Sequence, residues 1–154
     1  MLLKDEVDLL RKVPLFAHMD PAKLKLLAFT STRASFKPGQ ELFHQGDEAD
    51  AAYLILSGEA DVVADTVSGE VPVATVGHNA VVGEIAILCE VPRTASVRAV
   101  SQLETLKIEK EHFLRLIREF PDMGVEIMRE LGQRLTRTTA ELSQARSALV
   151  EAES

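Results

Sequence analysis

The sequence predicts an α+β domain built on an antiparallel β-roll of jelly-roll character with about eight strands. Short apolar segments separated by turn residues recur at regular spacing through the middle of the chain, a pattern typical of a sandwich or barrel. Helical spacing of apolar residues is confined to the two ends. The 154 residues correspond to a single domain and show no internal repeat. We therefore expect a helical segment over residues 1–35, the β-roll over residues 36–109 and two helices over residues 110–150.

The N-terminal segment contains a helix start that can be located from residue types alone. Asp20 is suited to accept hydrogen bonds from the free N–H groups of a first helical turn. Pro21 favours the first helical position, because its missing N–H is not needed there. Three apolar residues follow at helical spacing: Leu24, Leu27 and Ala28.

The middle of the chain alternates between β-type segments and turns. The turns are marked by glycine together with proline, serine or acidic residues, as at Lys37–Gln40, Gly46–Glu48 and Ser68–Gly69. The strands of the roll that the pattern locates are Glu41–Gln45, Ala52–Leu56, Ala60–Ala64, Val71–Val76, Ala95–Val100 and Leu103–Ile108.

Two helices are predicted at the C-terminal end. The first covers Glu111–Phe120, and Pro121 begins the second with Asp122 in its first turn. The apolar face of the first helix consists of Phe113, Leu116 and Ile117.

Composition and charge exclude several classes of protein. Tryptophan is absent and aromatic residues make up 5% of the chain, so the core is expected to be aliphatic. The single cysteine, Cys89, rules out an internal disulfide, and we expect it to be a small buried residue. The net charge of −7 gives no long-range attraction to nucleic acid. No apolar run approaches the roughly 20 residues of a membrane span, and the N-terminus does not resemble a secretory signal. We expect a cytoplasmic protein.

The stretch Gly83–Val97 is the most informative part of the chain. Gly83 leaves a strand and allows a tight backbone turn, and the single helical turn that follows has free N–H groups that can bind an anion. Arg93 can reach the same anion once the loop doubles back, and its planar guanidinium donates two parallel hydrogen bonds to a phosphate. Glu84 can only accept, so a sugar hydroxyl is its natural partner. These residues together predict a nucleotide pocket.

This stretch closely resembles the phosphate-binding cassette of the cyclic-nucleotide-binding domain family. The family pattern of Gly-Glu-apolar-Ala-apolar is met by Gly83–Ile87, and its Pro-Arg-small-Ala-Thr/Ser-Val pattern is met by Pro92–Val97. Upstream, the resemblance extends to Pro38–Gly39, Gln45–Asp47 and Tyr53–Gly58. Because it covers nearly the whole chain, it is far more specific than a lone glycine motif.

The resemblance implies a role for each residue of the cassette. Glu84 would hold the ribose 2′-hydroxyl, and Arg93 and Thr94 would contact the exocyclic oxygens of the cyclic phosphate. The backbone N–H of Ile85 or Ala86 would also donate to the phosphate. Three valines would line the base side of the barrel, namely Val62, Val73 and Val76.

Each of these residues also has an interpretation without a ligand. Glu84 and Arg93 could form a solvated ion pair near a turn. Thr94 could simply be a β-branched residue that begins a strand, and Gly83 could serve only the turn. The three valines are expected to belong to the core under either interpretation.

The last helix shows a heptad seam from Met128 to Leu149, although Thr138 and Ala145 weaken it. A helix of roughly 45 Å, at 1.5 Å per residue, is longer than a small barrel needs for packing. We therefore predict a parallel homodimer through this helix, as in the catabolite activator branch of the family. The seam residues are Met128, Leu131, Leu135, Thr138, Leu142, Ala145 and Leu149.

The same helix carries a candidate base contact. When the sequence is aligned on Arg134–Leu135, Thr138 and Thr139 match a Thr-Ser pair that reaches the adenine in the catabolite activator branch. The alternative is that both threonines are surface residues. The resemblance to bacterial receptors favours cyclic AMP as the ligand, whereas Thr94 is also compatible with cyclic GMP.

The expected function is ligand sensing rather than catalysis, with no cofactor besides the cyclic nucleotide. Binding would be signalled by a movement of the C-terminal helix. The chain ends at Ser154 without a helix-turn-helix, so we expect no direct DNA binding and an unknown effector protein as partner. One alternative is a cupin-like enzyme, which would need clustered metal-binding histidines, and another is a dimerisation module that has lost its ligand. The histidines are isolated in the sequence, at His18, His44, His78 and His112.

Overall fold

The computed structural model describes residues 3–13, 16–17 and 19–153. The chain forms two compact units, of which the first ends at Arg115 and the second begins at Leu116. The first unit contains all the strands and the cassette. The second contains the C-terminal helix.

The first unit opens with two helices, α1 (Leu3–Arg11) and α2 (Pro21–Thr30). The carboxylate of Asp20 accepts a hydrogen bond from the N–H of Ala22 at 3.0 Å, and Pro21 occupies the first turn. The predicted cap is therefore confirmed. The predicted apolar face is confirmed as well, because the buried residues of α2 are Leu24, Leu27 and Ala28.

Eight strands form two antiparallel sheets of four, as the sequence predicts. One sheet has the order β1-β8-β3-β6 and the other has the order β2-β7-β4-β5. The bounds of the strands are β1 Thr32–Phe36, β2 Glu41–Phe43, β3 Ala51–Ser57, β4 Ala60–Thr66, β5 Gly69–Val76, β6 Val81–Val82, β7 Ser96–Ala99 and β8 Leu103–Glu109.

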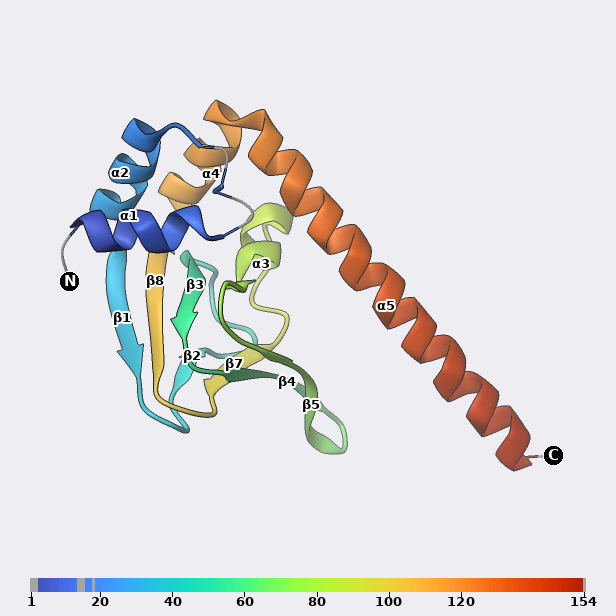
Figure 1. The fold of residues 1–154 in the computed structure, drawn as a ribbon. Helices are drawn as coiled ribbons and strands as arrows, with labels where there is room; N and C mark the ends of the chain where they lie inside the picture. The colour runs from blue at the N-terminus through green and yellow to red at the C-terminus, as the bar shows by residue number, and fades with distance from the viewer. Residues whose placement is uncertain (1–2, 14–15, 18, 154) are drawn as a thin grey trace. The chain divides into compact units, whose positions relative to one another are not determined.

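The strands pair as one long antiparallel hairpin that has been rolled up. β1 pairs with β8, β2 with β7, β3 with β6, and β4 with β5. Further pairing of β3 with β8 and of β4 with β7 completes the two sheets of the jelly roll, which are seen in Figure 1. The core between them is mostly aliphatic and contains Leu42, Ala51, Tyr53, Ile55, Ala60, Val82, Val97, Ala99 and Leu103.

Two strands differ from the sequence prediction. β1 begins at Thr32, so the predicted helical segment over residues 1–35 is wrong beyond α2. The reason is that β1 pairs only with β8 and contains no fully buried residue, so it lacks a hydrophobic alternation. β6 has only two residues, Val81–Val82, which is too short for a periodic signal.

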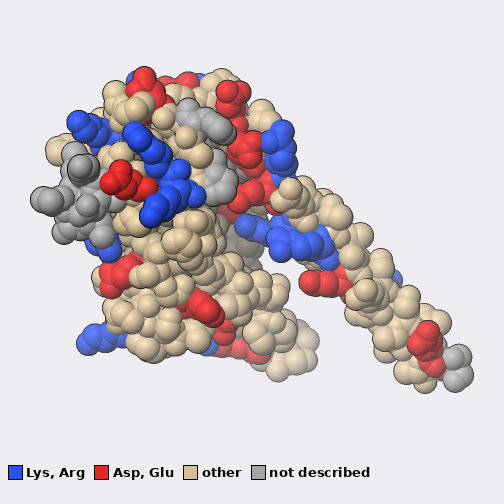
Figure 2. All heavy atoms as spheres, viewed as in Figure 1, with Lys and Arg blue, Asp and Glu red and all other residues tan. Residues whose placement is uncertain are grey.

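The C-terminal helices follow the prediction closely. α4 spans Lys110–Glu119 and α5 spans Pro121–Glu153. α5 has 33 residues, which corresponds to about 50 Å at 1.5 Å per residue. Within the described part of the chain, no helix is long and apolar enough to cross a membrane. Acidic and basic side chains are interspersed on the face shown in Figure 2.

Candidate functional site

The short helix α3 (Glu84–Cys89) follows β6 through a glycine that the geometry requires. Gly83 is the N-cap of α3 and has φ +85°, in the left-handed region that side chains disfavour. A Cβ atom at this position would lie 2.6 Å from Nη1 of Arg93 and 3.1 Å from the ring of Phe43. Gly83 therefore serves both the turn and the close approach of Arg93.

The side chain of Arg93 is completely buried against the backbone of the roll. Nη1 donates to the carbonyl of Gly83 at 2.7 Å, and Nη2 donates to the carbonyl of Ala51 at 2.6 Å. Nη2 also lies 3.6 Å from a carboxylate oxygen of Asp50. The guanidinium carbon is 3.9 Å from the ring centroid of Phe43, which is a cation–π geometry. Four residues from three different segments thus fix the guanidinium in place.

One donor of Arg93 remains unused. Its Nε is buried and has no hydrogen-bond partner among the described residues. Buried polar groups almost always have partners, so an exception calls for a specific explanation. Burial lowers the pKa of the Arg93 guanidinium, and the nearby carboxylate of Asp50 opposes that shift. A bound anion would supply both the missing acceptor and additional negative charge.

The backbone of Arg93 is also held, by the turn that follows β2. The N–H of Gly46 donates to the carbonyl of Arg93 at 2.9 Å, and the N–H of Arg93 donates to the carbonyl of Asp47 at 2.8 Å. The turn and the cassette are therefore joined by a reciprocal pair of hydrogen bonds.

Glu84 lies in the first turn of α3 and is only 6% exposed, while Arg93 is 2% exposed. The interpretation of these two residues as a solvated ion pair is therefore wrong. Ala86 is buried and Ile85 is half-buried. Cys89 is exposed, contrary to the expectation of a buried residue, because it ends the short helix where the chain turns outward at Glu90.

Thr94 is exposed and lies in a bend before β7. It therefore does not begin a strand, since β7 starts at Ser96. An exposed hydroxyl next to Arg93 can reach a ligand bound to the cassette.

The three valines predicted on the base side do not share one environment. Val62 and Val76 are partly buried and pack against the core. Val73 is 61% exposed, so its assignment to the core is wrong. The reason is that β5 is the edge strand of its sheet and is exposed from Gly69 to Thr75. The register of β4 with β5 also shifts here, since Val62 pairs with Ala74 and Val63 with Pro72.

The two threonines predicted to read the base lie on α5. Both are exposed, and the hydroxyl of Thr138 donates to the carbonyl of Arg134 at 2.9 Å. Their contact with a ligand stays a prediction.

The sequence interpretation missed the partners of Arg93, which are Phe43, Asp50 and Ala51. Nothing in the local pattern marks them, because they precede Arg93 by 42 residues or more. The only available signal was indirect, since the flanking segments Gln45–Asp47 and Tyr53–Gly58 already matched the family.

A jelly roll whose short helix and buried arginine are built from one cassette defines a class of ligand-binding regulatory domains. The family profile described as "Cyclic nucleotide-binding domain" matches residues 33–120. The chain belongs to this family.

Relatives with established names support the assignment. The chain is 32% identical over 130 residues to the cyclic AMP receptor protein of Thermus thermophilus, covering 84% of this chain and 60% of that protein. It is 34% identical over 108 residues to the cAMP-dependent protein kinase regulatory subunit of Emericella nidulans, covering 70% of this chain and 26% of the relative. The chain thus spans less than two thirds of either relative.

Solved structures show the same fold. The regulatory subunit of a cAMP-independent protein kinase A from Trypanosoma brucei superposes with a TM-score of 0.74 at 26% identity. The match covers 85% of this chain and 47% of that chain. These relatives differ in their relation to cyclic AMP, since one is a cyclic AMP receptor and another belongs to a cAMP-independent kinase. Membership of the family therefore does not fix the ligand.

Proposed function

We propose that this protein is a regulatory receptor that binds cyclic AMP through the cassette. The observation that supports this most strongly is the buried Nε of Arg93, which has no partner among the described residues. A cyclic phosphate offers acceptor oxygens to this donor and to the first-turn N–H groups of Ile85 and Ala86. Thr94, which is exposed beside Arg93, adds a hydroxyl to the same phosphate.

Glu84 is proposed to hold the ribose. Its carboxylate accepts hydrogen bonds, and it lies in the same short helix that begins beside Arg93. The negative charge of Glu84 also acts on Arg93, raising the pKa of the guanidinium against the effect of burial. Under this proposal the two buried side chains of the cassette serve one ligand, Arg93 at the phosphate and Glu84 at the sugar.

The preference for cyclic AMP over cyclic GMP rests on hydroxyl chemistry. A threonine hydroxyl has one proton to donate, and that of Thr138 is already donated to the carbonyl of Arg134. Its remaining capacity is to accept, which suits the amino group of adenine. The corresponding position of guanine is a carbonyl, which needs a donor. This arrangement favours adenine.

We propose that two copies associate in parallel through α5. In heptad terms Met128, Leu135, Leu142 and Leu149 occupy position a, and these side chains are 55–67% exposed. The same register puts Glu141 at position g and Arg146 at position e, so Glu141 faces Arg146 of the partner subunit in a parallel pair. A stripe of exposed large apolar residues on one helix fits a second copy of that helix.

The proposed role is sensing in the cytoplasm rather than catalysis, with an effector protein receiving the signal through α5. The named relatives are a receptor and a kinase regulatory subunit, and both descriptions denote regulation. The profile of the cyclic nucleotide-binding domain matches residues 33–120 of this chain. The output through α5 follows from the family resemblance.

Calorimetric titration of the purified protein tests the proposal. Cyclic AMP is expected to bind with one site per chain, and cyclic GMP is expected to bind more weakly. 5′-AMP serves as the control, because its phosphate is not cyclic. Tighter binding of cyclic GMP would overturn the ligand preference, and binding of neither cyclic nucleotide would overturn the proposed function.

A further inference from the structure

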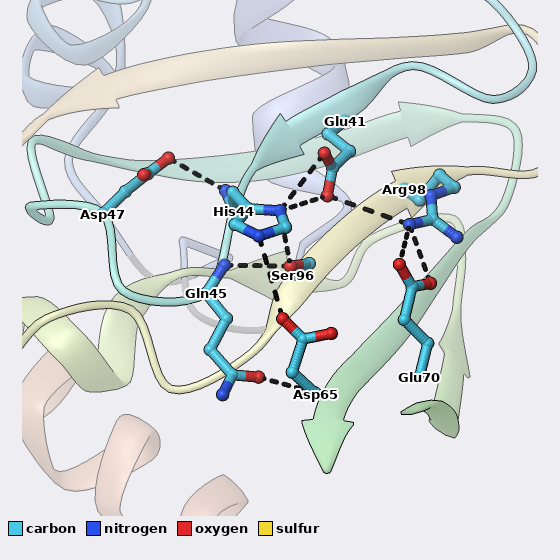
Figure 3. Close-up of polar contacts among 8 residues, drawn as sticks. All are labelled: Glu41, His44, Gln45, Asp47, Asp65, Glu70, Ser96 and Arg98. Atoms are coloured by element: carbon cyan, nitrogen blue, oxygen red, sulfur yellow. Dashed lines mark hydrogen bonds and ion pairs between the residues drawn. The ribbon is translucent and has the colours of Figure 1, made fainter. Parts of the chain in front are cut away.

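A polar network surrounds His44 on the second sheet, close to the cassette (Figure 3). Nδ1 of His44 lies 2.9 Å from a carboxylate oxygen of Glu41, and Nε2 lies 3.8 Å from a carboxylate oxygen of Asp65. The hydroxyl of Ser96 is 3.2 Å from Nδ1. These partners come from β2, β4 and β7, so the imidazole sits where three strands meet.

This arrangement suits the doubly protonated form of the imidazole. A carboxylate can only accept a hydrogen bond, so the nitrogen facing Glu41 carries the proton that this bond needs. Asp65 lies 3.8 Å from the other nitrogen, an ion-pair distance, and its charge favours the positively charged, doubly protonated ring. In keeping with this geometry, the hydrogen bond to Glu41 raises the pKa of His44, and the charges of Asp65 and Asp47 raise it further.

The other charged residues around His44 do not reverse the preference for the doubly protonated imidazole. Arg98 on β7 lies 2.9 Å from Glu70 on β5 and 4.0 Å from Glu41. Arg98 is thus paired chiefly with Glu70 and only distantly with the carboxylate that His44 uses. Around the imidazole the network contains one arginine and four carboxylates, those of Glu41, Asp47, Asp65 and Glu70.

Hydrogen bonds connect His44 to the backbone of Arg93. The N–H of His44 donates to the carboxylate of Asp47 at 3.0 Å, and the N–H of Asp47 donates to the carbonyl of His44 at 3.0 Å. The N–H of Gln45 donates to the Ser96 hydroxyl at 2.8 Å, which ties the turn to β7. The same turn holds Arg93 through Gly46 and Asp47. The backbone of His44 therefore belongs to the same tight turn that holds the backbone of Arg93.

We propose that His44 is a positioning residue whose doubly protonated form holds the turn at residues 44–47 against Arg93, so that affinity for the cyclic nucleotide falls as the pH rises. The inference rests on the proposed function, because it concerns the same cassette. His44 does not touch the ligand in this scheme. It acts through the backbone of Arg93.

The direction of the pH dependence follows from the direction of the pKa shift. An interaction made by a histidine with a raised pKa is fully present below the ordinary value of about 6.5. It is lost as the pH rises through the raised value. A surface ion pair of this type changes an equilibrium by about two- to fivefold, so an effect of that size is expected between pH 6 and pH 8.

The first test is calorimetric titration with cyclic AMP at pH 6 and pH 8. The unmodified protein is expected to bind about two- to fivefold more weakly at pH 8. His44→Gln, which keeps hydrogen-bonding capacity but cannot charge, is expected to show the same affinity at both values. The matched control is His112→Gln on α4, which is expected to retain the pH dependence. An equal pH dependence in His44→Gln and the unmodified protein would overturn the inference.

The second test needs no ligand and so separates this inference from the proposed function. NMR titration of the unliganded protein is expected to show the amide signals of Gly46 and Arg93 moving with the same apparent pKa as the ring protons of His44. In His44→Gln the two amide signals are expected to lose that titration. If they do not follow His44 in the unmodified protein, the inference is wrong even where cyclic AMP binds. If they follow it but no cyclic nucleotide binds, the coupling stands and only the proposed function fails.

Discussion

The cassette and α5 present their functional residues in opposite ways. Arg93 is 2% exposed, and every group that anchors it belongs to the first unit. On α5 all the seam residues except Leu131 are exposed, with Leu135 at 67% and Leu142 at 55%. Among the described residues, the chain itself thus surrounds Arg93 apart from one donor, whereas the large side chains at position a of the seam are exposed. This contrast agrees with the proposal that the cassette binds a small ligand and that α5 binds a second copy of the chain.

The largest effect is expected from breaking the seam. Leu135→Glu places a charge at the centre of the proposed dimer interface in both subunits. Burying a leucine contributes about 1.5–3 kcal/mol, so the loss of two should weaken dimerisation by a hundredfold or more. Analytical ultracentrifugation measures the dissociation constant directly.

The matched control for that variant is Gln133→Glu, which adds the same charge to α5 outside the seam and is expected to leave the dimer intact. An unmodified protein that sediments as a monomer at high concentration with cyclic AMP present would show that the seam does not bind a second copy. The exposed apolar seam of α5 would then have to bind a partner other than a second copy.

The next effect tests the cassette. Arg93→Ala removes charged hydrogen bonds worth about 1.5–3 kcal/mol and is expected to weaken cyclic AMP binding by about ten- to a hundredfold or more. Arg93→Lys is also expected to lose affinity, since an ammonium group cannot make the planar fork. Calorimetry gives the affinities, and circular dichroism on heating shows whether each variant folds.

Arg33→Ala is the control for these variants, because Arg33 is an arginine on the surface of β1. Its affinity for cyclic AMP is expected to match that of the unmodified protein. A folded Arg93→Ala protein with unchanged affinity would remove Arg93 from the site.

Gly83→Ala tests the surroundings of Arg93 with a smaller change of side chain. The methyl group would meet the buried Nη1 of Arg93 at 2.6 Å, and alanine disfavours the φ of +85°. A left-handed conformation costs about 1–2 kcal/mol for a residue with a side chain. We expect a loss of stability of that size in urea unfolding, together with weaker cyclic AMP binding because Arg93 must move.

Gly132→Ala on α5 is the contrasting variant. Nothing lies within 4 Å of a Cβ atom at that position, and alanine favours helix. Equal losses of stability in the two variants would show that the packing around Gly83 is not the reason for its presence.

The sequence predicts best those features whose cause is local. The cap at Asp20, the turn at Gly83 and the short helix α3 each depend on neighbouring residues, and the structure confirms them. The strand β1 was not predicted because its residues alternate too weakly, being covered on one side only by β8. Its pairing is a property of the tertiary fold and leaves no local signal.

The surroundings of Arg93 show the same limit within the candidate site. Its own position in the cassette is visible in the sequence, but Phe43 and Ala51 reach it only through the rolled topology. The exposure of Val73 is equally hidden, because it follows from the position of β5 at the edge of its sheet. Motifs therefore indicate which residues matter, while contacts between distant segments determine how those residues are held.

The last prediction concerns the choice of base, and it connects the two regions if it is found. Thr138→Ala combined with Thr139→Ala is expected to reduce the preference for cyclic AMP over cyclic GMP. One polar base contact is worth about 1–3 kcal/mol, so the preference should fall by roughly one to two decades. Competition of the two nucleotides for the protein measures the ratio.

Thr136→Ala is a closely matched control for this double variant. Thr136 is also exposed on α5, and its hydroxyl donates to the carbonyl of Gly132 at 2.9 Å, as that of Thr138 does to Arg134. Thr136→Ala and Thr138→Ala each remove the same kind of back-bonded hydroxyl from one helix, so a difference between these two changes reflects position and not helix stability. An unchanged preference in the double variant would remove the threonines from the site. It would also confine recognition of the nucleotide to the first unit, with Arg93, Glu84 and Thr94.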